Sequence, residues 1–256
     1  MTKPAHEAAA QHLLAARNRR TPGPRIPVES RPASIDDALA VQARVVALVA
    51  QPIGGWKCSV PSEPRPVALG PIFAPTILDT SPYPVVGSGA TARVEPEIAF
   101  VIGRDLPARA KPYSDDEVRD AIKEARFVLE ILGSRYAEST GITFPELLAD
   151  NVNNLGLFAG PALNNPWQQK LEAFPVTIRT PEGVFATRDG KHPDSHPLRP
   201  LFWLANYLAQ RGDPLRAGMI VTTGSYCGAV DVPLDKPLTF TYGDLGSLAV
   251  TFARAP

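Results

Sequence analysis

The stretch TARVEPEIAFVIGRDL, residues 91–106, places two acids inside an apolar run. Successive side chains of a β-strand point to opposite faces, so a strand at about 92–103 would carry Glu95 and Glu97 on the same face. Two partly buried carboxylates at that spacing repel each other unless a cation lies between them. The pattern therefore indicates either a divalent metal site or, at the edge of a sheet, a solvated charged face.

A third acid follows in ARFVLEILGSRYAE, where Glu130 lies within an apolar segment. A buried carboxylate is costly unless it is paired or bound to a metal, so Glu130 is either a third ligand or the partner of Arg126 or Arg135. Three carboxylates without nitrogen or sulfur ligands suit Mg²⁺ or Mn²⁺. All histidines fall in the N-terminal helix or in a loop rich in Pro and Asp, and they are interpreted as surface residues: His6, His12, His192 and His196.

Other polar residues are candidates for a pocket around these acids. Lys57 in GGWKCS is the only charged residue between Gln51 and Glu63, so it is either a desolvated acid–base group or a lysine whose head reaches solvent. The stretches LADNVNN and TTGSYCG lie at the ends of apolar strands and form either a pocket wall or ordinary turns. Their polar and glycine residues are Asp150, Asn151, Asn153 and Asn154, and Thr222, Thr223, Gly224 and Ser225.

The composition of the whole chain is that of a globular protein. Its 256 residues are 44% hydrophobic and 20% charged, and 26 basic residues balance 26 acidic ones. This balance offers no field for nucleic acid or an anionic membrane, and no apolar run approaches the roughly 20 residues that span a bilayer. A small-molecule ligand is therefore expected. The two cysteines are too few for a disulfide framework and favour a reducing cytoplasm.

The predicted secondary structure mixes helices and strands. Helices are expected at about 4–19 and 35–50, the second with Ser34 and Asp37 spaced as a capping box. Two more are expected, one that begins after Ser114 and continues through EVRDAIKEA, and one at about 197–211. Strands are expected at about 92–103, 126–132, 155–160, 174–180, 184–188, 218–223, 237–242 and 247–253, the last two joined by a GDLG turn. The division predicted from this pattern is a helical N-terminal region at 1–53 and a strand-rich domain at 54–256.

Several segments, taken together and in this order, resemble one enzyme family. GWK, VEPEIAFVIGRDLP, LEILGSRYAE, LADNVNN, PLRPLFWLAN, AGMIVTTGSYCGAV and YGDLGSLAVTF are similar to the 2-keto-4-pentenoate hydratase branch of the fumarylacetoacetate hydrolase superfamily. That branch also includes 2-oxohept-4-ene-1,7-dioate hydratases and 4-oxalocrotonate decarboxylases. The resemblance runs from about residue 34 to the end. It implies an α+β fold, in which a mixed β-roll of the fumarylacetoacetate hydrolase C-terminal-domain type forms the catalytic domain beside a helical N-terminal region.

The resemblance also implies a function and a site. Mg²⁺ or Mn²⁺ would be held by Glu95, Glu97 and Glu130 and would chelate a small 2-keto or 2-hydroxydienoic acid. Lys57 would transfer a proton or anchor a carboxylate, with Glu130 as the other catalytic residue. The substrate pocket would be lined by Lys57, Ser134, Arg135, Asp150, Asn151, Asn153, Thr223 and Gly224. The expected protein is a lyase, a cytoplasmic homo-oligomer that adds water to a 2-hydroxy-2,4-dienoate in aromatic meta-cleavage catabolism.

Decarboxylation of a related 2-keto dicarboxylate such as 4-oxalocrotonate is the alternative activity. Relatives commonly carry an acid in a P-D-[FY]-G stretch after the lysine, whereas this chain has GPIFAPT with Ile72 at that position, which mildly favours decarboxylation. Hydrolysis of a carbon–carbon bond is disfavoured because no H-x-x-E motif precedes the predicted strand that carries Glu95 and Glu97. A tautomerase and a non-catalytic metal-binding homologue are the other, less favoured readings.

Overall fold

The computed structural model describes residues 3–62, 68–87, 89–138 and 140–255. Two helices come first, α1 (Pro4–Arg19) and α2 (Ile35–Val49), and both agree with the predicted ranges. Ser34 caps α2 by accepting a hydrogen bond from the backbone N–H of Asp37. The short turn η1 (Val28–Ser30) lies between them. The buried faces of both helices are built mainly from small and branched aliphatic residues, so the two helices pack closely against each other.

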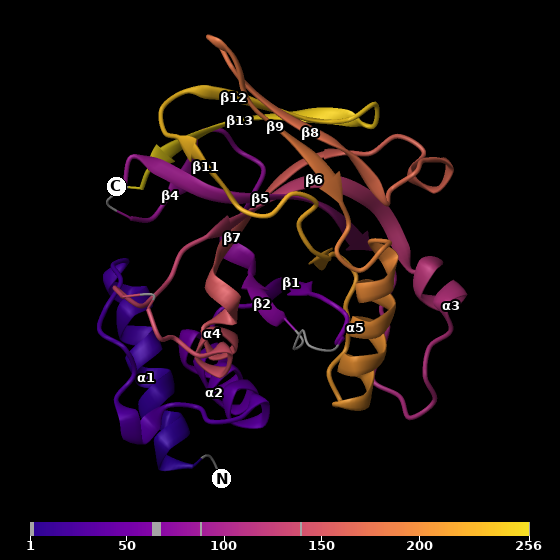
Figure 1. Ribbon diagram of the computed structural model, residues 1–256. Coiled ribbons are helices and arrows are strands. Elements are labelled where there is room, and N and C mark those ends of the chain that lie inside the picture. The colour runs from indigo at the N-terminus through magenta and orange to yellow at the C-terminus, as the bar shows by residue number, and fades with distance from the viewer. Residues whose placement is uncertain (1–2, 63–67, 88, 139, 256) are drawn as a thin grey trace.

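A strongly curved sheet forms the centre of the molecule. Its strand order is β2 (Leu69–Phe73), β1 (Ile53–Cys58), β10 (Ile220–Thr222), β5 (Thr91–Ile102), β6 (Ile122–Leu132), β7 (Asn154–Ala162) and β3 (Ile77–Leu78), and β11 (Val230–Pro233) pairs with the first residues of β5. Only the turn η2 (Ala74–Thr76) separates β2 from β3 in the chain, so the two ends of this order stay close together. The sheet therefore curls into a nearly closed barrel (Figure 1).

Strand pairing determines which side chains point into the barrel, because residues directly opposite each other share a face. Glu95 is opposite Glu130, and Glu97 is opposite Val128. Lys57 is opposite Thr222, which is itself opposite Ala99, so Lys57 shares this face. Beyond the charged residues the interior is an apolar layer of buried side chains: Ile72, Ala99, Val128, Leu157 and Ile220. The barrel is thus a packed core with charged groups at one end.

A second sheet covers the outside of the barrel. Its order is β4 (Tyr83–Val85), β13 (Gly246–Arg254), β12 (Pro237–Tyr242), β8 (Ala173–Thr180) and β9 (Gly183–Lys191). The Tyr242 hydroxyl donates a hydrogen bond to the carbonyl oxygen of Val128 at 2.9 Å, and the Tyr242 ring lies 4.8 Å from that of Phe127. Strands β12 and β13 pair up to Tyr242 and Gly246, which confirms the predicted GDLG hairpin.

Polar contacts join the N-terminal region to β2 of the barrel and to helix α4 (Phe144–Ala149). The side-chain amide of Gln42 in α2 donates hydrogen bonds to the carbonyl oxygens of Leu69 in β2 and Leu148 in α4. Arg25 makes two hydrogen bonds to the buried Glu146 of α4 at 2.7 and 2.6 Å. In Figure 1, α1, α2 and α4 form one group on the side of the barrel away from the second sheet.

Of the helices α3 (Asp115–Arg119) and α5 (Leu198–Gln210), only α5 agrees with the range predicted from the sequence, whereas α3 is much shorter than predicted. Ser114 and Glu117 form the expected capping box, but residues 122–125 belong to β6 and pair with β5. The helix prediction for EVRDAIKEA is therefore wrong beyond Arg119, because pairing with β5 outweighs the helix propensity of these residues.

Sequence patterns did not indicate α4 or the strands β1, β2, β3, β4 and β11. Strand β1 contains Gly54 and Gly55, and β2 contains Gly70 and Pro71, which weaken any strand signal. A Cβ at Gly55 would lie 2.2 Å from the carbonyl oxygen of Ile220, so the close pairing of β1 with β10 requires glycine there. No helix within the described residues is long and apolar enough to cross a membrane.

Candidate metal centre

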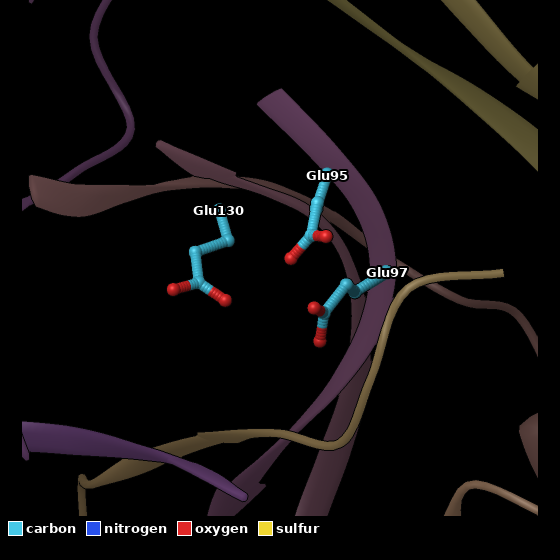
Figure 2. Close-up of side chains that lie close together, drawn as sticks. All are labelled: Glu95, Glu97 and Glu130. Carbon is cyan, nitrogen blue, oxygen red and sulfur yellow. The ribbon is translucent and has the colours of Figure 1, made fainter. Parts of the chain in front are cut away.

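Three carboxylates converge at the charged end of the barrel interior. Glu95 and Glu97 project from one face of β5, and Glu130 projects from β6 directly opposite Glu95. One oxygen of each carboxylate lies within 4.8 Å of the others. Figure 2 shows the three side chains pointing toward one another. The alternative of a solvated edge strand is wrong, because β5 lies between β10 and β6 in the middle of the sheet.

The acids are shielded from solvent and oppose one another's ionisation. Glu130 is 0% exposed and Glu97 is 2% exposed, while Glu95 is half-buried. Burial, followed by repulsion from Glu130 and Glu95, raises the pKa of Glu97 to about 8. Burial and repulsion from Glu130 also raise the pKa of Glu95. A cation between the three carboxylates would remove this opposition.

Lys57 is the cation that the described chain provides at this cluster. Its Nζ atom lies 2.5 Å from Oε1 of Glu130 and 3.2 Å from the carbonyl oxygen of Val152. Burial alone would lower the pKa of Lys57, but the carboxylates of Glu130, Glu95 and Glu97 outweigh that effect and raise the pKa. The alternative of a lysine that reaches solvent is wrong, since the residue is 8% exposed.

The residues present fit a divalent metal ion. Oε2 of Glu130 is buried and has no hydrogen-bond partner among the described residues, although its sister oxygen has two. All three ligand groups are carboxylates, the donor type that Mg²⁺ and Mn²⁺ prefer. If a bound cation kept all three carboxylates ionised, they would outnumber the single ammonium group by two charges, which is the charge of such an ion.

The turn that leads into β7, together with Asn154 at the start of that strand, holds both Glu130 and Lys57. The side-chain amide of Asn154 donates a hydrogen bond to Oε1 of Glu130 at 2.9 Å, and the carbonyl oxygen of Val152 accepts one from Lys57. Asn151, Val152 and Asn153 have φ values of 54°, 49° and 62°. A left-handed conformation is strained for a β-branched residue such as Val152, and strain of this kind concentrates at functional sites. The sequence had indicated Asn154 as pocket material but not its contact with Glu130, which is 24 residues away.

The loop after β10 lies against the carboxylate cluster on the side of Glu97. The backbone N–H of Gly224 donates a hydrogen bond to Oε2 of Glu97 at 2.9 Å. Gly224 has a φ of 119°, and a Cβ there would lie 2.9 Å from the Pro193 ring, so this approach requires glycine. The hydroxyl of the buried Thr223 donates to the carbonyl oxygen of Ile98 at 3.4 Å. Of the two predicted residues, Gly224 contacts an acid and Thr223 contacts the backbone of β5.

Arg135 is engaged within the protein. Its Nε lies 3.1 Å from Oδ1 of Asp150, and its other nitrogens donate to the carbonyl oxygens of Gly133 and Asn154. The side chain is 3% exposed, so it braces the turn that carries Asn154. The alternative in which Glu130 pairs with an arginine is wrong, since Lys57 takes that place.

The other predicted pocket residues also make contacts within this region. The Ser134 hydroxyl accepts a hydrogen bond from the backbone N–H of Tyr136 at 2.9 Å. The Asn151 amide donates to the carbonyl oxygen of Pro71 at 3.3 Å. Oδ1 of Asn151 and Oδ1 of Asn153 are buried and lack hydrogen-bond partners among the described residues. Ile72 is 0% exposed in the apolar layer of the barrel, where an acid would be surrounded by aliphatic side chains.

Two histidines differ from their predicted surface position. His6 is 9% exposed and lies 2.8 Å from a carboxylate oxygen of Asp37, while His192 is 1% exposed with its ring 5.3 Å from that of Tyr226. Both are buried because their segments pack against elements distant in sequence, which local composition does not reveal. His12 and His196 are partly exposed.

Comparison with known proteins decides the family. No family model matches the chain. A 2-keto-4-pentenoate hydratase of Paraburkholderia phymatum is 30% identical over 187 residues, which are 73% of this chain and 70% of that protein. The chain belongs to this family. A 4-oxalocrotonate decarboxylase of Pseudomonas putida is 29% identical over 160 residues, 62% of this chain and 60% of that protein.

Solved structures share the fold of this chain. A 4-oxalocrotonate decarboxylase from Pseudomonas putida G7, complexed with magnesium and adipate, has a TM-score of 0.78 at 21% identity, covering 98% of both chains. A putative fumarylacetoacetate hydrolase family protein from Yersinia pestis CO92 has a TM-score of 0.54 at 16% identity, covering 79% of this chain and 94% of that one. The predicted mixed α+β fold of the fumarylacetoacetate hydrolase type is therefore confirmed.

Proposed function

We propose that this member of the 2-keto-4-pentenoate hydratase family is a metal-dependent lyase that adds water to a small 2-hydroxy-2,4-dienoate and yields a 4-hydroxy-2-keto acid. The observation that carries the proposal is the buried cluster of Glu95, Glu97 and Glu130 with Lys57 beside it. The names of the relatives support it, since a 2-keto-4-pentenoate hydratase and a 4-oxalocrotonate decarboxylase are among them.

Glu95, Glu97 and Glu130 would hold Mg²⁺ or Mn²⁺. When bound, such an ion supplies Lewis-acid polarisation of the substrate's 2-oxo group. Lys57 stays protonated in this environment, so its ammonium group would hold the substrate carboxylate or donate a proton to the carbon chain. Glu130 accepts the hydrogen bond of that ammonium group and would keep it in place.

The other residues of the proposed pocket differ in how they would act. Gly224 and Thr223 form the wall beside Glu97, and the side chains of Asn151 and Asn153 offer buried amide oxygens that have no hydrogen-bond partner in the described part of the chain. Ser134, Arg135 and Asp150 would act through the turn that carries Asn154. In this proposal the catalytic domain spans residues 54–256, and the helical region at 1–53 packs against it.

A spectroscopic assay tests the hydratase proposal. Purified protein with Mg²⁺ should remove the ultraviolet absorbance of freshly generated 2-hydroxypenta-2,4-dienoate without releasing CO₂, and NMR should identify a 4-hydroxy-2-keto acid. Lys57→Met should slow the reaction by about 10²–10⁴-fold, the range of a general acid or base, while Lys170→Met at an exposed position should not slow it. A wild-type protein that binds Mg²⁺ but leaves a panel of dienoates of different lengths unchanged would contradict the proposal.

Decarboxylation of a 2-keto dicarboxylate is the second candidate, and Ile72 is the observation that favours it. Where relatives commonly carry an acid that could activate water, this chain has an isoleucine that is fully buried in the apolar layer. Decarboxylation places less demand on a positioned water. Release of CO₂ from 4-oxalocrotonate in the presence of Mg²⁺, without loss of absorbance from the monocarboxylic dienoate, would favour this candidate over hydration.

A further inference from the structure

A cavity of about 670 Å³ lies between the N-terminal helices and the barrel, and apart from Ser134 and Arg135 the residues that line it have no role in either proposed function. Its walls come from the C-terminal ends of α1 and α2, from β2, β3 and β4, and from residues 133–135. Lys57, Glu95, Glu97 and Glu130 do not line it, so it is separate from the candidate metal centre. Its volume is in the range of small-molecule binding sites, roughly 300–1,000 Å³.

The charged residues that line this cavity all have the same sign. They are Arg17, Arg20 and Arg135, and no acid among the described residues joins them. A second cavity of about 410 Å³, between α2 and the end of α5, is lined by Arg211 and Arg216 but also by Asp213. Cavities in this protein are therefore not all lined by positive charges alone. The positive lining of the first cavity favours an anionic ligand.

Arg17 carries the least compensated charge in the wall. Its Nε and Nη2 atoms are buried and have no hydrogen-bond acceptor among the described residues. Nη2 lies 3.6 Å from Oδ1 of Asp150, but Nε of Arg135 lies 3.1 Å from the same oxygen. Two buried guanidinium groups thus share one carboxylate, and a buried charge without a full partner is costly. Burial, followed by repulsion from Arg135, lowers the pKa of Arg17 to about 9.

We propose that this cavity binds a small organic carboxylate with an apolar body, and that Arg17 receives its carboxylate group. A guanidinium group offers a planar fork of donors that matches a carboxylate, and such a ligand would supply the second negative charge that Arg17 and Arg135 lack. The Arg17 guanidinium lies 5.6 Å from the centre of the Phe73 ring, which keeps it against an apolar wall.

The rest of the lining explains why the ligand needs an apolar body. Aliphatic and aromatic side chains make up most of the wall, including Leu14, Leu48, Val49, Phe73, Leu78 and Leu155. Isolated polar groups, such as those of Asn18, Thr21 and Gln51, interrupt it. This mixture suits a single ring or a short chain that ends in one carboxylate, because a bare inorganic anion would leave the apolar wall uncovered.

Isothermal titration calorimetry with benzoate tests the proposal on the full chain in the presence of Mg²⁺. Benzoate should bind with one site per chain, and the isosteric but uncharged benzamide should bind at least about tenfold more weakly, the effect of one charge-assisted contact. Arg17→Met should weaken benzoate binding by a similar factor. Arg17→Lys should retain part of the affinity, and Arg211→Met, a matched change in the other cavity, should leave it unchanged.

Lys57→Met separates this site from the metal centre. Benzoate affinity should survive in Lys57→Met, because that lysine does not line the cavity. Affinity that is lost in Lys57→Met but kept in Arg17→Met would place benzoate at the metal centre and overturn the proposal. No measurable binding of benzoate to a wild-type protein that still binds Mg²⁺ would overturn it as well. A failure of the hydratase and decarboxylase assays would leave this test unaffected.

Discussion

Two buried charge clusters of opposite sign meet at the turn of residues 150–154. In the first, three carboxylates surround Lys57, and Asn154 supports Glu130. In the second, Arg17 and Arg135 share the single carboxylate of Asp150. A protein interior tolerates charge only when it is paired, so each imbalance indicates a missing partner. The sign of the excess favours a cation in the first cluster and an anion in the second, as proposed above.

Loss of one carboxylate ligand should break the first cluster most severely. Glu97→Gln should lower Mg²⁺ affinity by more than the roughly 10–100-fold that outer partners of a metal site contribute, and metal-dependent turnover should fall to background. Titration calorimetry with Mg²⁺ measures the first effect.

Comparison of Glu130→Gln with Glu97→Gln tests the contact between Lys57 and Glu130. Glu130→Gln should also lose Mg²⁺ affinity, but it leaves the ammonium of Lys57 buried beside a neutral amide, which costs about 3–5 kcal/mol of unfolding free energy. Urea denaturation of the metal-free proteins should therefore show Glu130→Gln less stable than Glu97→Gln. Equal stability of the two variants would indicate that the Lys57–Glu130 contact does not form in solution.

Removal of the ammonium group of Lys57 should lower the turnover rate much more than it lowers the affinity for Mg²⁺. Lys57→Met should lower turnover by about 10²–10⁴-fold, the range of a general acid or base, while the three carboxylates still bind Mg²⁺. Steady-state kinetics and Mg²⁺ titration on the same preparation check this, with Lys170→Met as the matched control. Turnover within a few-fold of the wild type would remove Lys57 from the proposed chemistry.

The sequence could predict those parts of the metal centre that lie within one element. Strand periodicity alone put Glu95 and Glu97 on one face, and the cost of burying Glu130 marked it as paired or bound. It could not choose the partner of Glu130, because Lys57 reaches it from a strand 73 residues earlier in the chain. That strand, β1, was not predicted, because Gly54 and Gly55 weaken its strand signal; close packing against β10 requires Gly55, and close packing against Ala74 requires Gly54.

The second cluster was beyond local patterns for the same reason. Arg17 lies on a helix that was predicted correctly, but its contact with Asp150 depends on how that helix packs on the barrel. The strand at residues 122–125 shows the converse error, where a strong local helix pattern yields to pairing with β5. Local rules thus predicted most elements, whereas contacts between elements determine the charge balance of both clusters.

The support of Glu130 by Asn154 should be worth less than a ligand itself. Asn154→Leu removes the amide that donates to Oε1 of Glu130 without adding charge, so Mg²⁺ affinity should fall by about 10–100-fold. Calorimetry with Mg²⁺ measures this, and Asn164→Leu at an exposed position is the control. An unchanged Mg²⁺ affinity in Asn154→Leu would mean that the turn supports Lys57 alone.

A third buried cluster is centred on Glu146, and here the carboxylate has hydrogen-bond donors on both oxygens. It can be compared with the two clusters in which the charges are unbalanced. Its carboxylate accepts two hydrogen bonds from Arg25, at 2.7 and 2.6 Å, and two from Thr143, at 3.0 and 2.8 Å. Burial alone would raise the pKa of Glu146, but these hydrogen bonds outweigh it and lower the pKa from 4.5 to about 2. No missing ligand is indicated here.

The pH dependence of stability should reveal this difference. Because the pKa of Glu146 is lower in the folded than in the unfolded chain, its contribution is complete above about pH 4.5 and is lost as the pH falls toward 2. Glu146→Gln should lower the free energy of unfolding at pH 7 by about 2 kcal/mol, and the difference from the wild type should shrink between pH 4.5 and 2. Urea denaturation over this range measures it, with Glu138→Gln at an exposed position as the control. A difference that stays constant with pH would show that packing, and not the carboxylate charge, joins α4 to the N-terminal region.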